Sequence, residues 1–304
     1  MLSRNGNSLF LKSVCFGERA AATKYPLEQY KYDNLKQDKD DVMKKKLDWA
    51  QRFSIDLKQL VAMSIACASL ALTAQAFASD KLMVEYPTVN PGETEIGMRV
   101  MALSDSDPAV NGAQTWKLGA GYGFTNYWFS ELYAEYEKPA DSSTIKVQYY
   151  EWENLFRLTE PGRYWADWAI IMEYSYAIDD EEKDAYKIMP IMQKRFRKHM
   201  LTLNLGFERN PSENGTNKVQ LNYAWQYLWR GNPAYQFALE GYGQFGDVTN
   251  WSPRSQQTHQ IGPALVGLFK SGQDNAWDYR LGLYFGLTDA TPDRALMVSV
   301  EYEI

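Results

Sequence analysis

Large apolar residues occupy every second position from Val219 to Trp229, and mostly polar residues separate them. Alternation with a period of two places the two sets on opposite faces of a β-strand. The apolar set ends in aromatic side chains of the kind that favour the interface between membrane and water. A soluble sandwich would bury the same face, so this segment alone predicts only a half-covered strand. Its apolar positions are Val219, Leu221, Tyr223, Trp225, Tyr227 and Trp229.

The same alternation recurs to the last residue of the chain, in segments that turn-rich breaks separate. Short and long breaks alternate, as expected when tight turns lie on one rim of a membrane barrel and longer loops on the other. We therefore predict an all-β fold, an up-and-down antiparallel transmembrane β-barrel of about 12 strands. The predicted strands span residues 94–104, 114–125, 128–138, 144–158, 164–178, 185–197, 199–209, 218–230, 234–247, 257–270, 276–288 and 295–304.

Charged and polar residues recur on the face opposite the apolar one. Apolar residues facing out and charged residues facing in reverse the pattern of a soluble barrel, and they fit lipid outside and water inside. Segment 144–158 alternates less regularly, with Glu151 and Glu153 beside large aromatic residues, which predicts a β-bulge or a change of register. Segment 257–270 is similarly irregular. The candidates for lining the lumen and selecting solutes are Arg99, Lys117, Glu131, Glu135, Asp167, Glu173, Lys187, Arg195, Glu240, Arg280 and Glu301.

These inward charges allow two interpretations. A conduction pathway with an acidic and a basic side would select solutes by their charge. Cross-strand ion pairs would instead fill the interior and close the barrel, as they do in small barrels. Asp167 and Glu173 lie one predicted strand away from Lys187 and Arg195, so pairing between them is feasible. The sequence leaves both interpretations open.

One continuous apolar stretch, Leu60–Ala78, precedes the predicted barrel. A run of lysines comes before it and the small-residue pattern Ala76-Phe77-Ala78 ends it, as in a secretory signal peptide. We predict cleavage between Ala78 and Ser79. A transmembrane anchor is the alternative, which the small, Ala- and Ser-rich apolar core disfavours.

The chain accordingly divides into three parts. Residues 1–42 are predicted to be a mis-called upstream extension, because a signal peptide beginning at Met43 has ordinary proportions; an unusually long charged region is the alternative. Residues 43–78 are the predicted signal peptide and residues 79–304 the barrel. The barrel part opens with a proline-containing stretch, residues 79–93, that is expected to be an extended lead-in.

Removal of the first 78 residues changes the charge balance. The full chain has 32 basic and 38 acidic residues; the removed part contains 12 and 8 of them, which leaves 20 and 30 and a net charge of about −10. This balance argues against nucleic acid as a partner. Cys15 and Cys67 are removed as well, so neither disulfides nor thiolate chemistry are expected. The mean hydropathy of −0.48 does not oppose a membrane barrel, because lipid-facing residues alternate with polar ones.

The sequence offers little for catalysis. The two histidines, His199 and His259, stand without a recognisable Ser motif or the partners that a triad requires. The glycines of 119–123 lead into another predicted strand and not into the helix that a dinucleotide site needs. No metal-ligand spacing appears. We therefore predict no catalytic residues, no metal and no cofactor.

Short glycine- and aromatic-rich elements at 121–125 and 282–293 suggest a family. The first reads Gly-Tyr-Gly-Phe-Thr, and the second contains Tyr-Phe-Gly-Leu-Thr-Asp followed by Thr-Pro-Asp. They resemble repeated elements of the outer-membrane proteins associated with the meta-pathway of phenol degradation, often described as transporters. The resemblance implies an outer-membrane barrel that admits small organic solutes. Ile304 departs from the terminal Phe that is usual in outer-membrane barrels.

The combined prediction is an exported outer-membrane channel of a Gram-negative bacterium for passive uptake of small solutes, aromatic or charged ones among them. Its expected partners are outer-membrane lipid, the solute and the barrel-assembly machinery. Two alternatives remain. One is an outer-membrane lipid-modifying enzyme, which would need a Ser or Asp beside His259. The other is a closed structural barrel whose loops bind a partner.

Overall fold

The structure is a computed structural model that describes residues 82–178, 183–209, 218–271 and 275–304. The predicted upstream extension (1–42), the signal peptide (43–78) and the cleavage between Ala78 and Ser79 lie outside the described residues and stay predictions.

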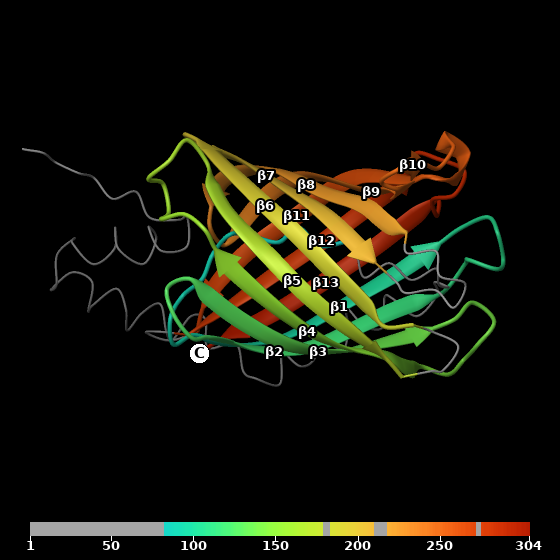
Figure 1. The fold of residues 1–304 in the computed structure, drawn as a ribbon, viewed down its shortest axis with the longest axis horizontal. Helices are drawn as coiled ribbons and strands as arrows, with labels where there is room; N and C mark the ends of the chain where they lie inside the picture. Colours follow the sequence, from blue (N-terminus) through green and yellow to red (C-terminus); the bar gives the residue numbers. More distant parts are fainter. Residues whose placement is uncertain (1–81, 179–182, 210–217, 272–274) are drawn as a thin grey trace, which may run out of the picture.

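Long antiparallel strands form one sheet that closes into a 12-strand barrel, with the short strand β10 extending β9 at one rim (Figure 1). Each long strand is hydrogen-bonded to the long strands before and after it in the sequence, β10 pairs with β9, and β1 pairs with β13. This confirms the predicted fold class. The elements are β1 (Thr94–Ser104), β2 (Gln114–Gly123), β3 (Trp128–Lys138), β4 (Lys146–Arg157), β5 (Asp167–Ala177), β6 (Ala185–Phe196), β7 (His199–Arg209), β8 (Val219–Asn232), β9 (Tyr235–Asp247), β10 (Asn250–Trp251), η1 (Arg254–Gln256), β11 (Thr258–Lys270), β12 (Ala276–Gly286) and β13 (Arg294–Glu303).

The barrel closes where its first and last strands meet. The amide of Thr94 donates to the carbonyl of Ile304 at 3.1 Å, and the amide of Ile304 donates back at 2.8 Å. Because the number of long strands is even, both ends of the barrel reach the same rim, where the C-terminus is marked in Figure 1. Closure leaves no unpaired edge among the long strands, which a strand surrounded by lipid requires.

The two faces of the sheet differ in polarity as predicted. Large apolar side chains such as Leu132 (64% exposed) and Phe237 (57% exposed) point outward, whereas Gln226 and Glu240 are fully buried inside. In β8 the Tyr and Trp positions lie outside, so the opening Val219–Trp229 pattern is a strand with its polar face toward the lumen. Among the described residues, no helix is long and apolar enough to cross a membrane.

The irregularity predicted in segment 144–158 is also present. Glu135 pairs with Tyr149, but the next residue, Tyr136, pairs with Val147, so one residue of β4 is left over as a bulge. With this bulge, Glu151 and Glu153 take inward positions and the aromatic residues between and beside them face outward.

The predicted lead-in takes an unexpected path. Residues 82–90, here called the inner strap, run through the inside of the barrel and turn into β1 at Pro91-Gly92. Leu82, Val84 and Val89 are at most 3% exposed because they pack against inward-facing apolar residues of the strands. Pro87 lacks an N–H, which keeps the strap extended but unsuited to a sheet ladder.

Candidate functional site: the barrel lumen

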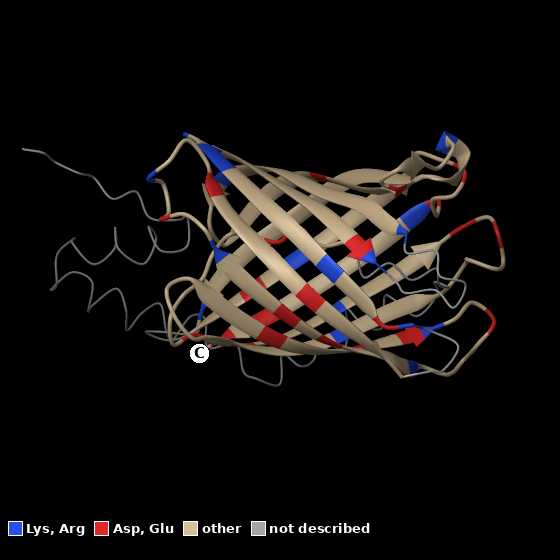
Figure 2. Cartoon of the chain, viewed as in Figure 1, with Lys and Arg blue, Asp and Glu red and all other residues tan. Residues whose placement is uncertain are grey.

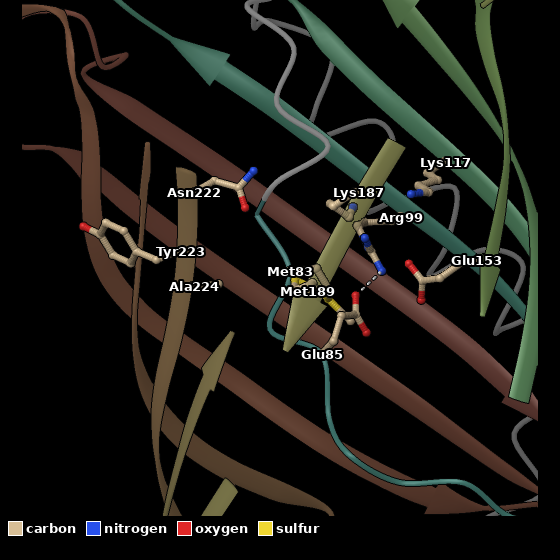
Figure 3. A pocket seen from close by; sticks show the side chains of 10 residues that line it. All are labelled: Met83, Glu85, Arg99, Lys117, Glu153, Lys187, Met189, Asn222, Tyr223 and Ala224. Atoms are coloured by element: carbon tan, nitrogen blue, oxygen red, sulfur yellow. Dashed lines mark ion pairs between the residues drawn. The ribbon is translucent and has the colours of Figure 1, made fainter. Parts of the chain in front are cut away.

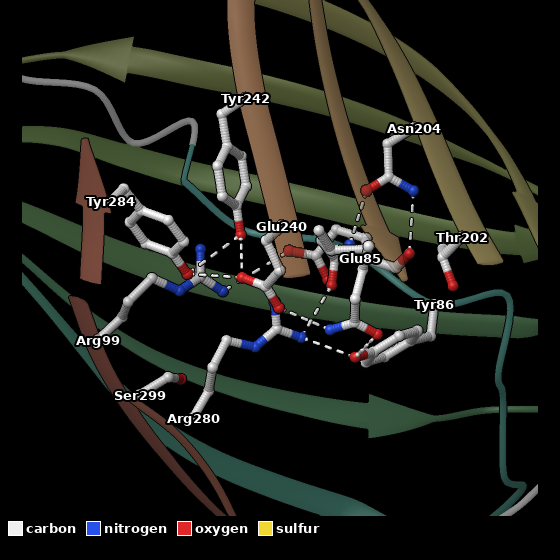
Figure 4. Close-up of polar contacts among 12 residues, drawn as sticks. Glu85, Tyr86, Arg99, Thr202, Asn204, Glu240, Tyr242, Arg280, Tyr284 and Ser299 are labelled. Carbon is white, nitrogen blue, oxygen red and sulfur yellow. Dashed lines mark hydrogen bonds and ion pairs between the residues drawn. The ribbon is translucent and has the colours of Figure 1, made fainter. Parts of the chain in front are cut away.

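Glu240 on β9 is the centre of a buried polar network inside the barrel (Figure 4). Its carboxylate is fully buried and accepts hydrogen bonds from Gln226 Nε2 (2.6 Å), the Tyr242 hydroxyl (2.6 Å) and the Tyr284 hydroxyl (2.5 Å). Arg280 on β12 completes the network, with one guanidinium nitrogen 3.3 Å from the same carboxylate. A buried charge is tolerated only when it is paired and hydrogen-bonded, and both conditions are met.

The same network holds the inner strap. Arg280 donates to the Tyr86 hydroxyl at 2.9 Å and to the Val84 carbonyl at 3.3 Å, and the Tyr86 hydroxyl donates to Gln226 at 2.9 Å. On β7, the Asn204 side chain accepts from the amide of Glu85 at 2.8 Å and donates to the carbonyl of the same residue at 2.9 Å (Figure 4). The strap is thus fastened to β7, β8 and β12 by side chains.

Every basic residue among the sequence-predicted lumen candidates lies in an ion pair with a carboxylate. Arg195 pairs with Asp167 at 3.1 Å and Lys187 pairs with Glu173, as the spacing along the chain had allowed. The other three pairs bring in carboxylates beyond neighbouring strands. They are Lys117 with Glu151, Arg280 with Glu240, and Arg99 with Glu85 of the strap, the last at 3.6 Å.

A hollow of about 160 Å³ remains between the strap and the wall formed mainly by β1, β3, β4, β12 and β13. Eight carboxyl side chains line it against two guanidinium groups, so acidic groups outnumber basic ones around this space. Charged positions lie on the strands themselves and not only in the loops (Figure 2). The carboxylates are Glu85, Glu93, Glu95, Glu131, Glu153, Asp278, Glu301 and Glu303, and the guanidinium groups are Arg99 and Arg280.

Three of these carboxylates form a close group at the rim where the strap enters β1. Oxygen atoms of Glu93, Glu95 and Glu303 lie within 4.8 Å of one another. Carboxylate oxygens at this spacing are able to share a cation.

All eleven sequence-predicted lumen candidates occupy strand positions on the face that bears Glu240. Glu131, Glu301, Arg99 and Arg280 line the hollow, whereas the remaining seven lie in ion pairs, in the Glu240 network or, for Glu135, opposite Lys117 in the strand register.

Several lumen residues escaped the sequence analysis. Glu153 carried a usable signal, since it stands two positions after Glu151 and two such residues share a strand face. Glu85 and Tyr86 carried no such signal, because a lead-in segment that packs inside a barrel has no characteristic hydrophobic period. Asn204 and Gln226 were on the polar face but nothing in their spacing pointed to a segment that they would hold.

The environment of His259 bears on the enzyme alternative. Its Nδ1 lies 2.9 Å from the Tyr223 hydroxyl and its Nε2 lies 2.8 Å from the side-chain oxygen of Gln257. The Ser or Asp that a lipid-modifying enzyme would need is therefore not among the described partners of its ring nitrogens. His199 stacks on Tyr227, 3.0 Å from its hydroxyl.

Comparison with known proteins adds a likeness of architecture. No protein-family model and no curated protein matches the chain. Among solved structures, the chain is similar to the NanC porin, with 10% identity over 68% of this chain and 98% of that one and a TM-score of 0.45. The KdgM porin gives 8% identity, coverages of 69% and 97%, and a TM-score of 0.44. The outer-membrane protein Omp33 of Acinetobacter baumannii gives 10% identity over 70% of this chain and 97% of that one, with a TM-score of 0.38.

Identities this low leave the function to be argued from the lumen. The resemblance to the phenol meta-pathway family stays a prediction.

Proposed function

We propose that this protein is an outer-membrane channel for the passive passage of small solutes. The observation that carries the proposal is the inverted polarity of a closed barrel, with exposed aromatic and aliphatic side chains outside and a charged hollow inside. A surface of this kind is stable in lipid, and a lumen of this kind is stable only with water or polar solutes in it. Export to the outer membrane, the surrounding lipid and delivery by the barrel-assembly machinery belong to the same proposal.

The charge of the hollow refines the class of solute. Eight carboxylates against two guanidinium groups make a field that attracts cations and repels anions. The five basic lumen candidates do not form a separate positive side, since each already faces a carboxylate. We therefore propose that small cationic solutes pass more readily than anions of the same size.

The test is electrical. Purified full-length protein is inserted into a planar bilayer that separates two KCl solutions of different concentration, and the reversal potential is measured. We expect discrete conductance steps, and we expect the sign of the reversal potential to show that K⁺ passes more readily than Cl⁻. Heat-denatured protein serves as the control. A preference for Cl⁻ would contradict the proposed solute class, and no conductance at any voltage, in this protein and in the strap variant introduced below, would overturn the channel.

One observation favours a second candidate, the closed structural barrel. The inner strap and the ion pairs fill much of the lumen. The two candidates differ in one property, which is whether the strap leaves its place.

A further inference from the structure

The lumen wall recognises the main chain of the inner strap. Asn204 is fully buried and forms two hydrogen bonds with the amide and carbonyl of Glu85, while Arg280 and Arg157 donate to the carbonyls of Val84 and Val89, both at 3.3 Å. Hydrogen bonds of this kind bind the main chain of an extended peptide and do not depend on its side chains. These wall side chains therefore hold an extended segment through its main chain.

The strap is not part of the sheet. The strand order contains no strand from residues 82–90, and β1 already pairs with β13 on one side and β2 on the other. The described contacts that fasten the strap come from side chains of the wall, and its covalent link to the barrel runs through Gly92, which has a φ of +82°. Removing the strap from the wall would thus leave the strand ladder intact.

The strap also separates two spaces. Met83 and Glu85 line both the acidic hollow and a second, smaller cavity of about 30 Å³, shown in Figure 3. Arg99 borders both as well and is joined to Glu85 by an ion pair. If the strap moved out, these spaces would merge into one passage.

We propose that the inner strap is a resident plug on a peptide-binding face of the lumen, and that its displacement opens the passage. The proposal rests on the channel function above. It assigns Asn204, Gln226 and Arg280 as the residues that hold the plug, and the ligand class of this face as an extended peptide.

The first test weakens the plug without changing a strand. Tyr86→Ala removes the hydroxyl that binds Gln226 and Arg280. In planar bilayers we expect its mean conductance to exceed that of the unmodified protein several-fold. The matched control is Tyr150→Ala, which removes an outward-facing tyrosine that is 53% exposed, and its conductance should stay unchanged. Both variants are checked for the gel shift on heating that marks a folded barrel.

The second test replaces the plug from outside. A synthetic peptide with the sequence of residues 82–90 is added to Tyr86→Ala and should reduce its conductance in a dose-dependent way. A second peptide carries Pro at the position of Glu85, which removes the N–H that Asn204 accepts. It should block at least several-fold more weakly. Equal block by the two peptides would contradict the assigned recognition by Asn204.

A third test does not depend on Tyr86→Ala folding correctly. Glu85→Cys and Arg99→Cys, in a background with Cys15→Ser and Cys67→Ser, are joined by a reducible bifunctional thiol reagent that spans the original ion pair. We expect the joined protein to lose conductance and to recover it on reduction. Unchanged conductance would overturn the proposal, because a passage that opens while the strap is held does not need the strap to move.

The outcomes separate the two proposals. If neither the unmodified protein nor Tyr86→Ala conducts, the channel function fails. If both conduct to the same extent, the plug is wrong and the channel function stands.

Discussion

The two walls of the lumen differ in how their polar groups are satisfied. Where the strap lies, Asn204, Gln226 and Glu240 are fully buried and each is hydrogen-bonded to a named partner. Across the hollow, carboxyl groups such as Glu131 and Glu301 line an open space. One wall resembles the interior of a soluble protein, and the other resembles the lining of a water-filled site.

This difference separates stability from function. A buried network of paired and hydrogen-bonded groups specifies one arrangement and is costly to disrupt. Like charges gathered around a space contribute nothing favourable to folding, so they are expected where a protein uses them. We therefore expect substitutions of the wall residues in the Glu240 network to change stability, and substitutions on the hollow side to change ion selectivity with little effect on stability.

The largest effect is expected for Glu240→Gln. The change leaves the buried guanidinium of Arg280 without its counter-charge, which should lower the free energy of unfolding by about 3–5 kcal/mol. Guanidinium unfolding in detergent micelles, followed by tryptophan fluorescence, measures this. The matched variant Glu301→Gln removes a carboxyl group that lines the hollow and accepts a hydrogen bond from Ser299, and it should change the same quantity by less than about 1 kcal/mol. Equal losses would remove the distinction between the walls.

A smaller effect is expected from adding one methyl group to each wall. A Cβ at Gly262 would lie 1.8 Å from the carbonyl oxygen of Leu283, so backbone must move, and Gly262→Ala should cost about 1–3 kcal/mol. A Cβ at Gly119 would meet a side chain, the ring of Tyr133 at 2.3 Å, and this ring lines the hollow, where a side chain shifts at less cost than a backbone carbonyl. Gly119→Ala should therefore cost less than about 1 kcal/mol in the same unfolding assay. A larger loss for Gly119→Ala would show that the hollow wall is packed as rigidly as the strap wall.

The smallest expected effect concerns selectivity. Replacing Glu131 and Glu301 together by Gln removes two of the eight carboxylates of the hollow and should lower the K⁺/Cl⁻ permeability ratio about two-fold, while the free energy of unfolding changes little. Glu160→Gln, in an exposed loop pair with Arg163, is the control and should leave the ratio unchanged. An unchanged ratio in the double variant would place the selecting charges elsewhere.

Much of the barrel could be predicted from the sequence, because each strand carries its own signal. The strand predicted at 144–158 is observed at Lys146–Arg157, including its bulge, and the strand predicted at 295–304 is observed at Arg294–Glu303. The pairing of Glu173 with Lys187 was also within reach, since consecutive antiparallel strands bring such positions together. The position of the strap could not be predicted, because residues 82–90 show neither the period of two of a strand nor the period of 3.6 of a helix.

The sequence by itself determined which face of each strand meets lipid and which meets the lumen, since alternation with a period of two is a local property of the chain. Only the tertiary structure decided what occupies that lumen. The contact between Glu85 and Asn204 joins residues 119 positions apart through a main-chain amide and carbonyl that every residue except proline offers. Because these main-chain groups are the same in almost every residue, no sequence pattern predicts which of them Asn204 binds. Closure of the barrel brings Glu85 close enough to form the contact.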